Sequence, residues 1–459
     1  MHYEKFQDGT VKCIEDEIPF EVPEGWAWCK LNDIYNFIDY RGATPTKITN
    51  GIPLVTAKNV KSGYIDYTID DYISEEEFKE RQQRGISKKG DILFTTEAPL
   101  GNAALADMEK FSAGQRLITF QQYGSKDELI NYVMLMFILS DFFQQQLYVN
   151  KTGSTVAGIK AAILKTLWIP VPPYNEQLRI SNTLKSARNL IDSISKNKEI
   201  LSTSISNTKS KILDLAIRGK IVPQDPNDEP ASVLLERIRA EKEELIKQGK
   251  IKRDKKESVI FKGDDNSYYL RTGGVEESLE DWRFDDLPET WKICCLWELC
   301  DYGDCINVNT EDIAEDAWIL DLEDIEKDTG TVLKKVTKAQ RNSVSTKHKF
   351  HSGQVLYSKL RPYLNKVVLS DADGYCTSEI LPLEFKNCVL PEYARYYLMS
   401  GTFIAYANHC SYGVKMPRLG TTDGKKAIFS LPPLSEQKRI VETIDFCFMQ
   451  LNKISEALA

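Results

Sequence analysis

The stretch P-P-Y-N-E-Q-L-R-I, residues 172–180, opens the segment that decides the architecture of this chain. After it, apolar residues recur at alternating steps of four and three as far as Leu215. A stripe that repeats every 3.5 residues is typical of a long helix that packs against a partner helix. Such a helix over 176–217 would be about 60 Å long at 1.5 Å per residue. That length exceeds the core of an ordinary domain.

A second copy of this opening lies in the same chain. The stretch P-P-L-S-E-Q-K-R-I at 432–440 repeats it, and the same steps of four and three follow. The residues predicted to form the contact between the two helices are Ile180, Leu184, Ala187, Ile191, Ile194, Leu201 and Ile205 on the first, and Ile440, Ile444, Cys447, Leu451, Ile454 and Leu458 on the second. A motif repeated together with its heptad register indicates an internal duplication.

The duplication extends into the regions before each long helix. The first copy contains Pro23-Glu24-Gly25-Trp26, and the second has Pro288-Glu289-Thr290-Trp291 at the corresponding place. The stretch 353–365 likewise corresponds to 90–102, with Gly, Leu, Pro and Asn at matching positions. The copies differ most in their loops, as expected of one scaffold that carries two readers for different targets. The chain begins partway through a repeat, which predicts that its two ends lie close together.

Local patterns predict the elements of each copy. In the first copy, strands are expected at 52–55, 64–67, 91–95, 117–120 and 168–171. One helix over 127–146, capped by Ser125, should follow the fourth of these strands. The long helix should end near Gly219, and a charged helix over 231–248 should come before a basic linker at 250–256.

Composition limits the class of protein. A chain of 459 residues is long enough for two or three domains. The longest apolar run, 132–139, is too short to span a bilayer, and the first residues lack the pattern of a signal peptide, so a cytoplasmic location is expected. The 10 cysteines and 4 histidines show no metal-ligand spacing. Reduced, mostly buried thiols and no metal site are therefore predicted.

The distribution of charge says more than its sum. The net charge of -8 by itself disfavours a nucleic-acid binder. However, the stretch 334–370 contains nine basic residues and no acid, whereas 311–328 is crowded with acids. This segregation suggests a basic face on an acidic protein, and the alternative is an ordinary solvated run of charge.

The motifs of a self-sufficient enzyme are missing from the sequence. No G-x-G triplet, phosphate-binding G-K-[ST] loop or H-E-x-x-H pair occurs. The P-P-Y at 172–174 resembles part of the catalytic motif of amino-methyltransferases, but Val171 and Leu431 stand where that motif needs a polar side chain. The prolines are better explained as the entry to the long helix, because proline fixes the backbone angle and has no N–H donor.

These features in combination resemble the DNA-specificity subunit of Type I restriction-modification systems. The resemblance rests on two domains that each begin near a tryptophan, contain a G-D-I-L or G-Q-V-L strand, and end with P-P-x-x-E-Q-x-R-I. It also rests on the central run L-D-L-A-I-R-G-K-I-V-P-Q-D at 213–225. It covers nearly the whole chain. One departure is the short second helix, which reaches only Ala459 and so pairs with only part of the first.

The resemblance implies a fold and a set of partners. The fold is α+β, with two repeated target-recognition domains joined by an antiparallel coiled-coil spacer in a pseudo-two-fold arrangement. Each domain reads one half of a split double-stranded DNA sequence. The helices set the spacing and bind two methyltransferase subunits that flip the target adenine, and motor-nuclease subunits complete a phage-defence complex. This chain would be non-catalytic and bind no cofactor, while S-adenosylmethionine, ATP and Mg belong to the partner subunits.

Polar and basic side chains on loops are the expected DNA contacts, since base edges and phosphates are read by such groups. In the second domain the candidates are Lys359, Arg361, Tyr363 and Asn365, then Lys347, Lys349, Ser411, Tyr412 and Lys415. In the first domain they are Arg41, Lys58, Asn59, Thr95, Thr96, Asn102, Ser154 and Thr155. An ordinary surface role is the alternative for each of them.

The expected domain boundaries follow from the repeats. They are 1–171 for the first recognition domain with an N-terminal arm, 172–265 for the central helical region and linker, 266–431 for the second domain, and 432–459 for the C-terminal helix. Two other classes of function stay open at this point. One is a helical repeat adaptor that binds protein partners, and the other is a stand-alone DNA methyltransferase.

Overall fold

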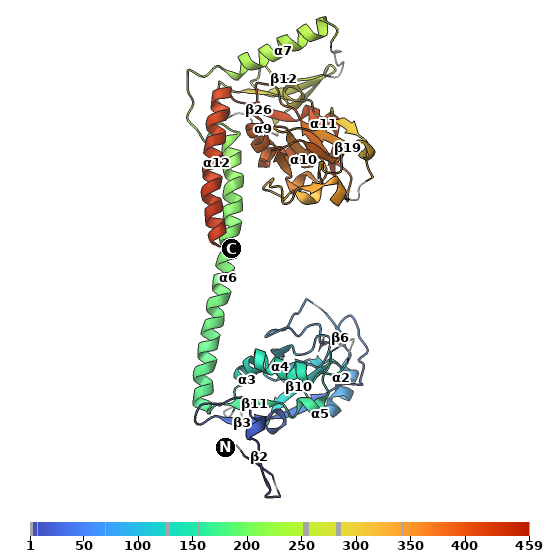
Figure 1. The fold of residues 1–459 in the computed structure, drawn as a ribbon, viewed down its shortest axis with the longest axis vertical. Coiled ribbons are helices and arrows are strands. Elements are labelled where there is room, and N and C mark those ends of the chain that lie inside the picture. The colour runs from blue at the N-terminus through green and yellow to red at the C-terminus, as the bar shows by residue number, and fades with distance from the viewer. Residues whose placement is uncertain are drawn as a thin grey trace. The chain divides into compact units, whose positions relative to one another are not determined.

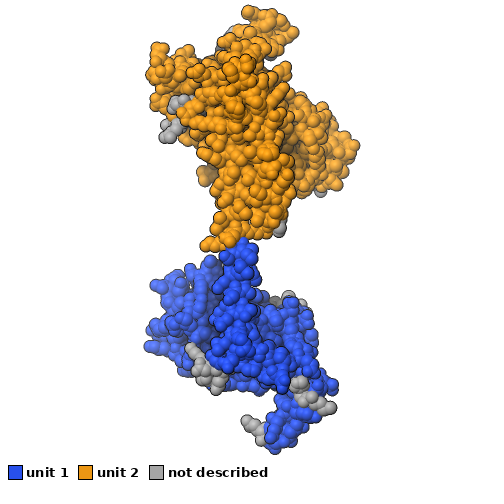
Figure 2. Space-filling view, turned by 90° about the vertical axis from the view of Figure 1, so that its left-hand side faces the viewer, with its two compact units in different colours: residues 1–195 blue, residues 196–459 orange. Residues whose placement is uncertain are grey.

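A computed structural model describes residues 3–6, 8–68, 70–124, 129–153, 157–250, 257–280, 286–341 and 344–458. The chain divides into two compact units, which we call unit 1 (residues 1–195) and unit 2 (residues 196–459) (Figure 2). Each unit combines helices with sheets (Figure 1). Each also has hydrophobic clusters of its own. The α+β class predicted from the sequence is thus confirmed in both.

Unit 1 is organised around a four-stranded sheet in the order β4-β10-β7-β8. These strands are Tyr35–Asp39, Leu117–Gln122, Ile92–Thr95 and Ala103–Leu105. A second sheet has the order β6-β5-β9, with strands Tyr72–Ile73, Ile52–Val55 and Ser112–Ala113. Two-stranded pairs join β3 (Ala27–Lys30) to β11 (Trp168–Val171) and β1 (Tyr3–Lys5) to β2 (Val11–Cys13). The helices are α1 (Leu31–Ile34), α2 (Glu75–Arg81), α3 (Asn131–Ile138), α4 (Asp141–Val149) and α5 (Ala161–Leu164).

Unit 2 contains a three-stranded sheet, β21-β20-β23, with strands Val367–Leu369, Val355–Ser358 and Ile380–Leu383. A five-stranded sheet has the order β16-β19-β22-β17-β18, with strands Ile306–Val308, Lys347–Phe350, Gly374–Thr377, Trp318–Leu320 and Val336–Thr337. The smaller sheets pair β15 (Lys292–Cys295) with β26 (Ile428–Leu431), β24 (Ser411–Tyr412) with β25 (Arg418–Leu419), and β12 (Ser258–Lys262) with β13 (Tyr268–Thr272) and β14 (Val275–Ser278). The helices are α7 (Ala231–Lys247), α8 (Leu296–Leu299), α9 (Pro391–Leu398), α10 (Gly401–His409), α11 (Thr421–Lys426) and α12 (Leu434–Ala457).

The two units contain the same central strands in the same register. In unit 1, β7 lies between β8 and β10, and in unit 2, β20 lies between β21 and β23, all antiparallel. Among the described residues each unit also contains a parallel pair, β5 with β9 in unit 1 and β17 with β22 in unit 2. The duplication expected from the sequence is therefore a duplication of strand pairing.

The repeated P-P-x-x-E-Q motif has a structural role that is the same in both units. The indole Nε1 of Trp26 donates to Glu176 at 3.1 Å, and that of Trp291 donates to Glu436 at 2.9 Å. These bonds tie the start of each long helix to the tryptophan turn of the same unit, at 23–26 in unit 1 and at 288–291 in unit 2.

The glutamine of the same motif makes a second tie. In unit 1, Gln177 donates to the carbonyl of Pro172 at 2.9 Å and accepts from the backbone N–H of Ile130 at 2.7 Å. In unit 2, Gln437 does the same with Pro432 at 3.0 Å and Leu390 at 2.8 Å. Both glutamines are fully buried. Each therefore satisfies a backbone carbonyl and a backbone N–H that water cannot reach.

The long helix α6 runs over Tyr174–Ala216, and α12 packs along its C-terminal part within unit 2 (Figure 1). The Oγ of Ser430, just before α12, donates to the carbonyl of Ile217 at 2.8 Å. Further along α12, Asn452 accepts from Lys209 at 2.6 Å. Residue numbers rise along α12 while those of its contacts on α6 fall, so the two helices are antiparallel, as the family resemblance implies.

The predicted contact residues behave differently along the helices. Ile205, Ile440 and Ile444 are buried, and Leu184, Cys447, Leu451 and Leu458 are half-buried. Ile180 packs on the core of unit 1, because the helix start lies against that core. Ala187, Ile191, Ile194, Leu201 and Ile454 are exposed, so the predicted burial at these five positions is wrong for the chain alone. At Ala187, Ile191 and Ile194 the reason is length, since α12 has 24 residues and α6 has 43.

Two other sequence predictions need correction. The single helix expected over 127–146 is two helices, α3 and α4, because Ser140 caps a new helix by accepting from the N–H of Phe143 at 3.4 Å. Its expected cap, Ser125, lies outside the described residues. The strand expected at 64–67 is a turn with one isolated bridge, since Asp66 accepts from the backbone and hydroxyl of Thr68.

Candidate nucleic-acid interface

In unit 2 the loop that follows the central strand β20 meets the hairpin β24–β25. The N–H of Leu419 donates to the carbonyl of Lys359 at 3.0 Å, and the N–H of Arg361 donates to that of Pro417 at 2.7 Å. These backbone bonds bring the candidates at 359–365 together with those at 411–415. We call this meeting point of loop and hairpin the junction of unit 2.

Unit 1 has the same junction. The N–H of Ile159 donates to the carbonyl of Thr96 at 3.0 Å, and Thr152 bridges to Gly158 in the facing hairpin. A cavity of 470 Å³ opens here, lined by Arg41, Gly42, Thr96, Glu97, Gln115, Arg116, Thr152, Gly153, Gly158, Ile159 and Lys160. The junction of unit 1 is thus a polar hollow with three basic residues around it.

Several candidates of unit 2 are exposed at or near its junction. The side chains of Tyr363 and Tyr412 are 49% and 62% exposed. Lys415 is also exposed, and Lys359 is half-buried. Lys349 is exposed too, but it lies on β19 and belongs to neither the loop nor the hairpin. Exposed aromatic and basic side chains on one loop and one hairpin can contact a nucleic acid without rearrangement of the core.

Arg361 is held in the left-handed region, with φ of 50°. Its Nη2 reaches the carbonyl of Lys415 at 3.4 Å, and its Nε is buried without a hydrogen-bond partner among the described residues. A left-handed backbone is uncommon for a residue other than glycine and tends to occur at functional sites. The side chain therefore stands at the junction with donor capacity that the described contacts do not use.

Three other candidates of unit 2 are engaged inside the protein. Asn365 is 9% exposed and donates to the carbonyl of Met399 at 3.3 Å. Lys347 is 2% exposed and lies 3.0 Å from the hydroxyl of Ser345, and Ser411 donates to the carbonyl of Ala407 at 2.6 Å. These three side chains are therefore engaged within unit 2 and are less available to DNA than the exposed candidates.

In unit 1 the polar candidates are mostly internal. Thr95 and Thr96 are 0% and 2% exposed, and their hydroxyls donate to the carbonyls of Asn102 and Arg116. Asn59 is buried and bonds to Thr56 and Asp66, while Asn102 donates to the carbonyl of Val60. Arg41 pairs with Asp39 at 2.6 Å, and Lys58 is exposed. Ser154 and Thr155 lie outside the described residues.

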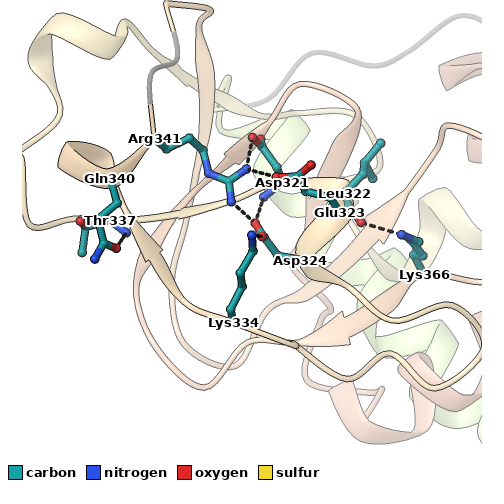
Figure 3. Close-up of polar contacts among 9 residues, drawn as sticks. All are labelled: Asp321, Leu322, Glu323, Asp324, Lys334, Thr337, Gln340, Arg341 and Lys366. Atoms are coloured by element: carbon teal, nitrogen blue, oxygen red, sulfur yellow. Dashed lines mark hydrogen bonds and ion pairs between the residues drawn. The ribbon is translucent and has the colours of Figure 1, made fainter. Parts of the chain in front are cut away.

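The basic stretch 334–370 does not form a uniform basic face, because acids that precede it in sequence neutralise part of it (Figure 3). Arg341 pairs with Asp321 and Asp324, each at 2.5 Å. Lys334 lies 3.6 Å from Asp324 and Lys338 lies 3.0 Å from Glu315. The prediction of a basic face is wrong for this part of the stretch. The acidic and basic residues are separated along the sequence, but they form ion pairs with one another in the folded protein.

The Asp324 carboxylate is the centre of that cluster. Its exposed fraction is 0%, and it also accepts from the backbone N–H of Asp321 at 2.9 Å. Lys366 lies nearby and donates to the carbonyl of Leu322 at 2.6 Å (Figure 3). Burial lowers the pKa of Lys366. The cluster fixes the segment 321–341 against the sheets and leaves fewer cations for an external anion.

The cysteines carry no chemistry that the structure supports. All ten are free, and Cys294, Cys295, Cys300, Cys376 and Cys388 are buried. Burial raises the pKa of Cys295 to about 12, which keeps the thiol protonated and unreactive at neutral pH.

Within the described ranges no three His, Cys, Asp or Glu residues gather as a metal site would require. None of the described helices has the length and apolar composition needed to cross a membrane.

Comparison with known proteins decides the family. Residues 23–202 and 288–457 each match the family described as the Type I restriction modification DNA specificity domain. This chain belongs to that family. The specificity subunit of the Type I restriction enzyme EcoAI from Escherichia coli is 26% identical over 98% of this chain and 82% of its own length. The specificity subunit of EcoEI from Escherichia coli is 24% identical over 99% of this chain and 83% of its own.

Solved structures show the same fold for this specificity-family member. A crystal structure of the HsdS subunit from Thermoanaerobacter tengcongensis is 16% identical with a TM-score of 0.50, over 96% of this chain and 93% of that one. A chain from a structure on complex assembly and conformational transition of the type I R-M system is also 16% identical, with a TM-score of 0.56, over 96% of this chain and 94% of that one.

Sequence reasoning missed two ion pairs at the junctions of this specificity-family protein. In unit 1, Glu97 pairs with Arg116 at 3.0 Å. In unit 2, Glu379 pairs with Arg418 at 3.0 Å, and this contact raises the pKa of the guanidinium. Their spacing along the chain gave no signal. The backbone alignment of 90–102 with 353–365, extended to the next strand, could have found them.

Proposed function

We propose that this chain is the sequence-specific DNA recognition subunit of a Type I restriction-modification complex and that it is not itself catalytic. Unit 1 would read one half of a bipartite target and unit 2 the other. The observation that carries this proposal is the repeated junction, because the same backbone bonds present different side chains in each unit. A common frame with different contact groups is what two readers of different half-sites require.

The long helices supply the second part of the function. We propose that α6 and α12 set the spacing between the half-sites and bind two methyltransferase subunits. The exposed apolar residues of α6, including Ile191 and Ile194 at 58% each, support a role in subunit contact. Motor-nuclease subunits would join this assembly. S-adenosylmethionine, ATP and Mg would be bound by the partners, and the complex would act on DNA in the cytoplasm as a defence against phage.

The domain assignment follows the sequence repeats. The first recognition domain is 1–171, the central helical region is 172–265, the second recognition domain is 266–431, and the C-terminal helix is 432–459. The pseudo-two-fold relation between the two halves is part of this proposal. It is supported by the matched strand registers and by the matched tryptophan and glutamine contacts of each unit.

Exchange of one domain tests this function. Residues 288–431 would be replaced by the same region of a relative with a different target, and the complex with its methyltransferase would be expressed in cells. We expect long-read mapping of methylated adenines to show a new sequence in one half of the target only. Exchange of 23–171 is the matched control and should change the other half. A change in both halves, or in neither, after a single exchange would contradict the assignment.

Salt dependence separates this function from that of a protein-binding adaptor. A DNA-binding complex loses affinity steeply as salt rises, because phosphate contacts release counterions. We expect the assembled complex to bind a duplex with its methylated sequence more tightly than a scrambled duplex of equal length. Equal binding to both duplexes at every salt concentration would argue against sequence recognition.

A further inference from the structure

Each junction contains one carboxylate and one guanidinium in contact. In unit 1 the Nε of Arg116 lies 3.0 Å from an Oε of Glu97. In unit 2 the Nε of Arg418 donates to both oxygens of Glu379 at 3.1 Å and 3.2 Å, and its Nη2 donates at 3.0 Å. Both pairs therefore hold the Nε edge of the guanidinium.

Arg116 and Glu379 occupy the same position in the fold. The carbonyl of Arg116 accepts from the N–H of Thr96 at 3.1 Å, and the carbonyl of Glu379 accepts from that of Lys359 at 3.0 Å. Each directly precedes the strand, β10 or β23, that pairs with the central strand of its unit. This shared position thus carries an arginine in unit 1 and a glutamate in unit 2. Its partner, Glu97 or Arg418, comes from the loop after β7 in unit 1 and from β25 in unit 2.

The opposite charges at this shared position separate two roles of the pair. A contact that only holds the loop against its neighbour needs two opposite charges, and either order satisfies it. The side chains are 53% and 45% exposed in unit 1, and 33% and 24% exposed in unit 2, and ion pairs at such exposure add little to stability. The order of the charges is thus free to serve recognition.

The chemistry of the guanidinium suggests what is recognised. When a carboxylate accepts from the Nε edge, N–H donors of the Nη groups are left over, because each Nη carries two N–H groups. In unit 2 the Nη1 of Arg418 also donates to the carbonyl of Met416 at 3.4 Å, and Nη2 donates to Glu379, so one N–H of each Nη remains. A fork of two N–H donors matches the O6 and N7 acceptors of guanine in the major groove, the commonest specific contact of arginine with DNA. The carboxylate fixes the plane of this fork before DNA arrives.

We propose that Arg116 in unit 1 and Arg418 in unit 2 each determine one guanine-containing base pair of the target, with Glu97 and Glu379 as the residues that position them. This inference rests on the proposed function. Because the arginine comes from the strand in unit 1 and from the hairpin in unit 2, the guanine falls at different places within the two half-sites. Exposed Tyr412 and Lys415 flank the pair on the hairpin of unit 2 and supply contacts to sugar and phosphate.

The test uses the full chain assembled with its methyltransferase subunits, with methylated-adenine mapping and competition binding as measurements. In Arg418→Gln we expect one guanine-containing position in one half-site to lose discrimination by on the order of tenfold to a hundredfold. In Arg116→Gln we expect the same loss at one position of the other half-site. The exchange Glu379→Arg with Arg418→Glu keeps an ion pair and should change the base selected at the first of these positions.

A matched control lies elsewhere in unit 2. Arg271 and Glu276 form an ion pair at 2.8 Å whose side chains are 54% and 48% exposed, on β13 and β14. The exchange Arg271→Glu with Glu276→Arg should leave both half-sites unchanged. This control separates an effect of the junction from a general effect of moving charges on the surface of unit 2.

Three results would overturn the inference. The first is an unchanged target in the Glu379→Arg, Arg418→Glu exchange. The second is uniform loss of methylation in Arg418→Gln that this exchange restores with the original target, which would make the pair a clamp only. The third is loss at the same half-site in Arg116→Gln and Arg418→Gln. Failure of the proposed function looks different, because the unaltered complex would then methylate no bipartite sequence.

Discussion

Unit 1 and unit 2 share their central strands and differ in what surrounds them. Both have the antiparallel triplet, the parallel pair, and the tryptophan and glutamine ties at the root of the long helix. Unit 2 extends the sheet of its parallel pair to five strands and adds the Asp324 cluster, whereas unit 1 extends its central sheet with β4. The comparison shows that the same pairing of central strands can carry different charged side chains on the surrounding loops.

The largest expected effect concerns the tryptophan tie. Trp291 is 6% exposed, whereas Trp26 is half-buried, although both donate to a glutamate. Trp291→Ala should lower the free energy of unfolding by about 3–5 kcal/mol, because it leaves a cavity and removes a buried bond. Trp26→Ala should cost clearly less. Denaturant unfolding of the full chain measures both, and equal costs would break the distinction between the two roots.

The next effect concerns ion pairs. Asp324→Ala removes the fully buried carboxylate that faces Arg341 and should cost about 3 kcal/mol, since a poorly solvated charge loses its partner. The matched change in unit 1 is Asp39→Ala, whose pair with Arg41 is partly exposed. That change should cost about 1 kcal/mol or less. Thermal unfolding of the two variants distinguishes them, and a reversed order would contradict the role given to the cluster.

The smallest effect is a pH dependence in unit 2. Burial of His348 lowers the pKa of its imidazole, against the bond to the carbonyl of Ile380 at 2.8 Å, which favours the charged ring. A pKa below that of the unfolded chain means that the unfolded state binds more protons as pH falls from about 6.5. Stability should therefore decrease over that window. The decrease in melting temperature between pH 7.5 and pH 5.5 should be smaller in His348→Gln than in the unaltered chain. An equal decrease in both would contradict this explanation.

The sequence predicted the fold through its repeats. The spacing of Ile440 and Ile444 identified the helix pair, and the matched 90–102 and 353–365 stretches identified the matched central strands. Periodicity and punctuation carry such information because they reflect burial and backbone angles directly. The expected closeness of the two chain ends stays a prediction.

The candidate site was predicted less well, for physical reasons. A threonine or asparagine on a loop suits a DNA contact and a buried turn equally, and Thr95 and Asn59 serve the turn. The charge of Arg341 was read from its neighbours in sequence, whereas its partners Asp321 and Asp324 lie across a turn of the chain. Whether a basic side chain can bind DNA depends on the ion pairs that it forms in the folded protein. The order of residues in the sequence does not show these pairs.

The ties made by Gln177 and Trp26 have a mechanical consequence. A helix of 43 residues is a lever of about 65 Å at 1.5 Å per residue. A tilt of about 5° at its root would move the far end by roughly 6 Å, close to two steps of about 3.4 Å along a DNA strand. The bonds of Gln177 and Trp26 therefore resist a tilt of α6 at its root. Under the proposed function, the tilt that they still permit limits how sharply the helix can set a distance between two half-sites.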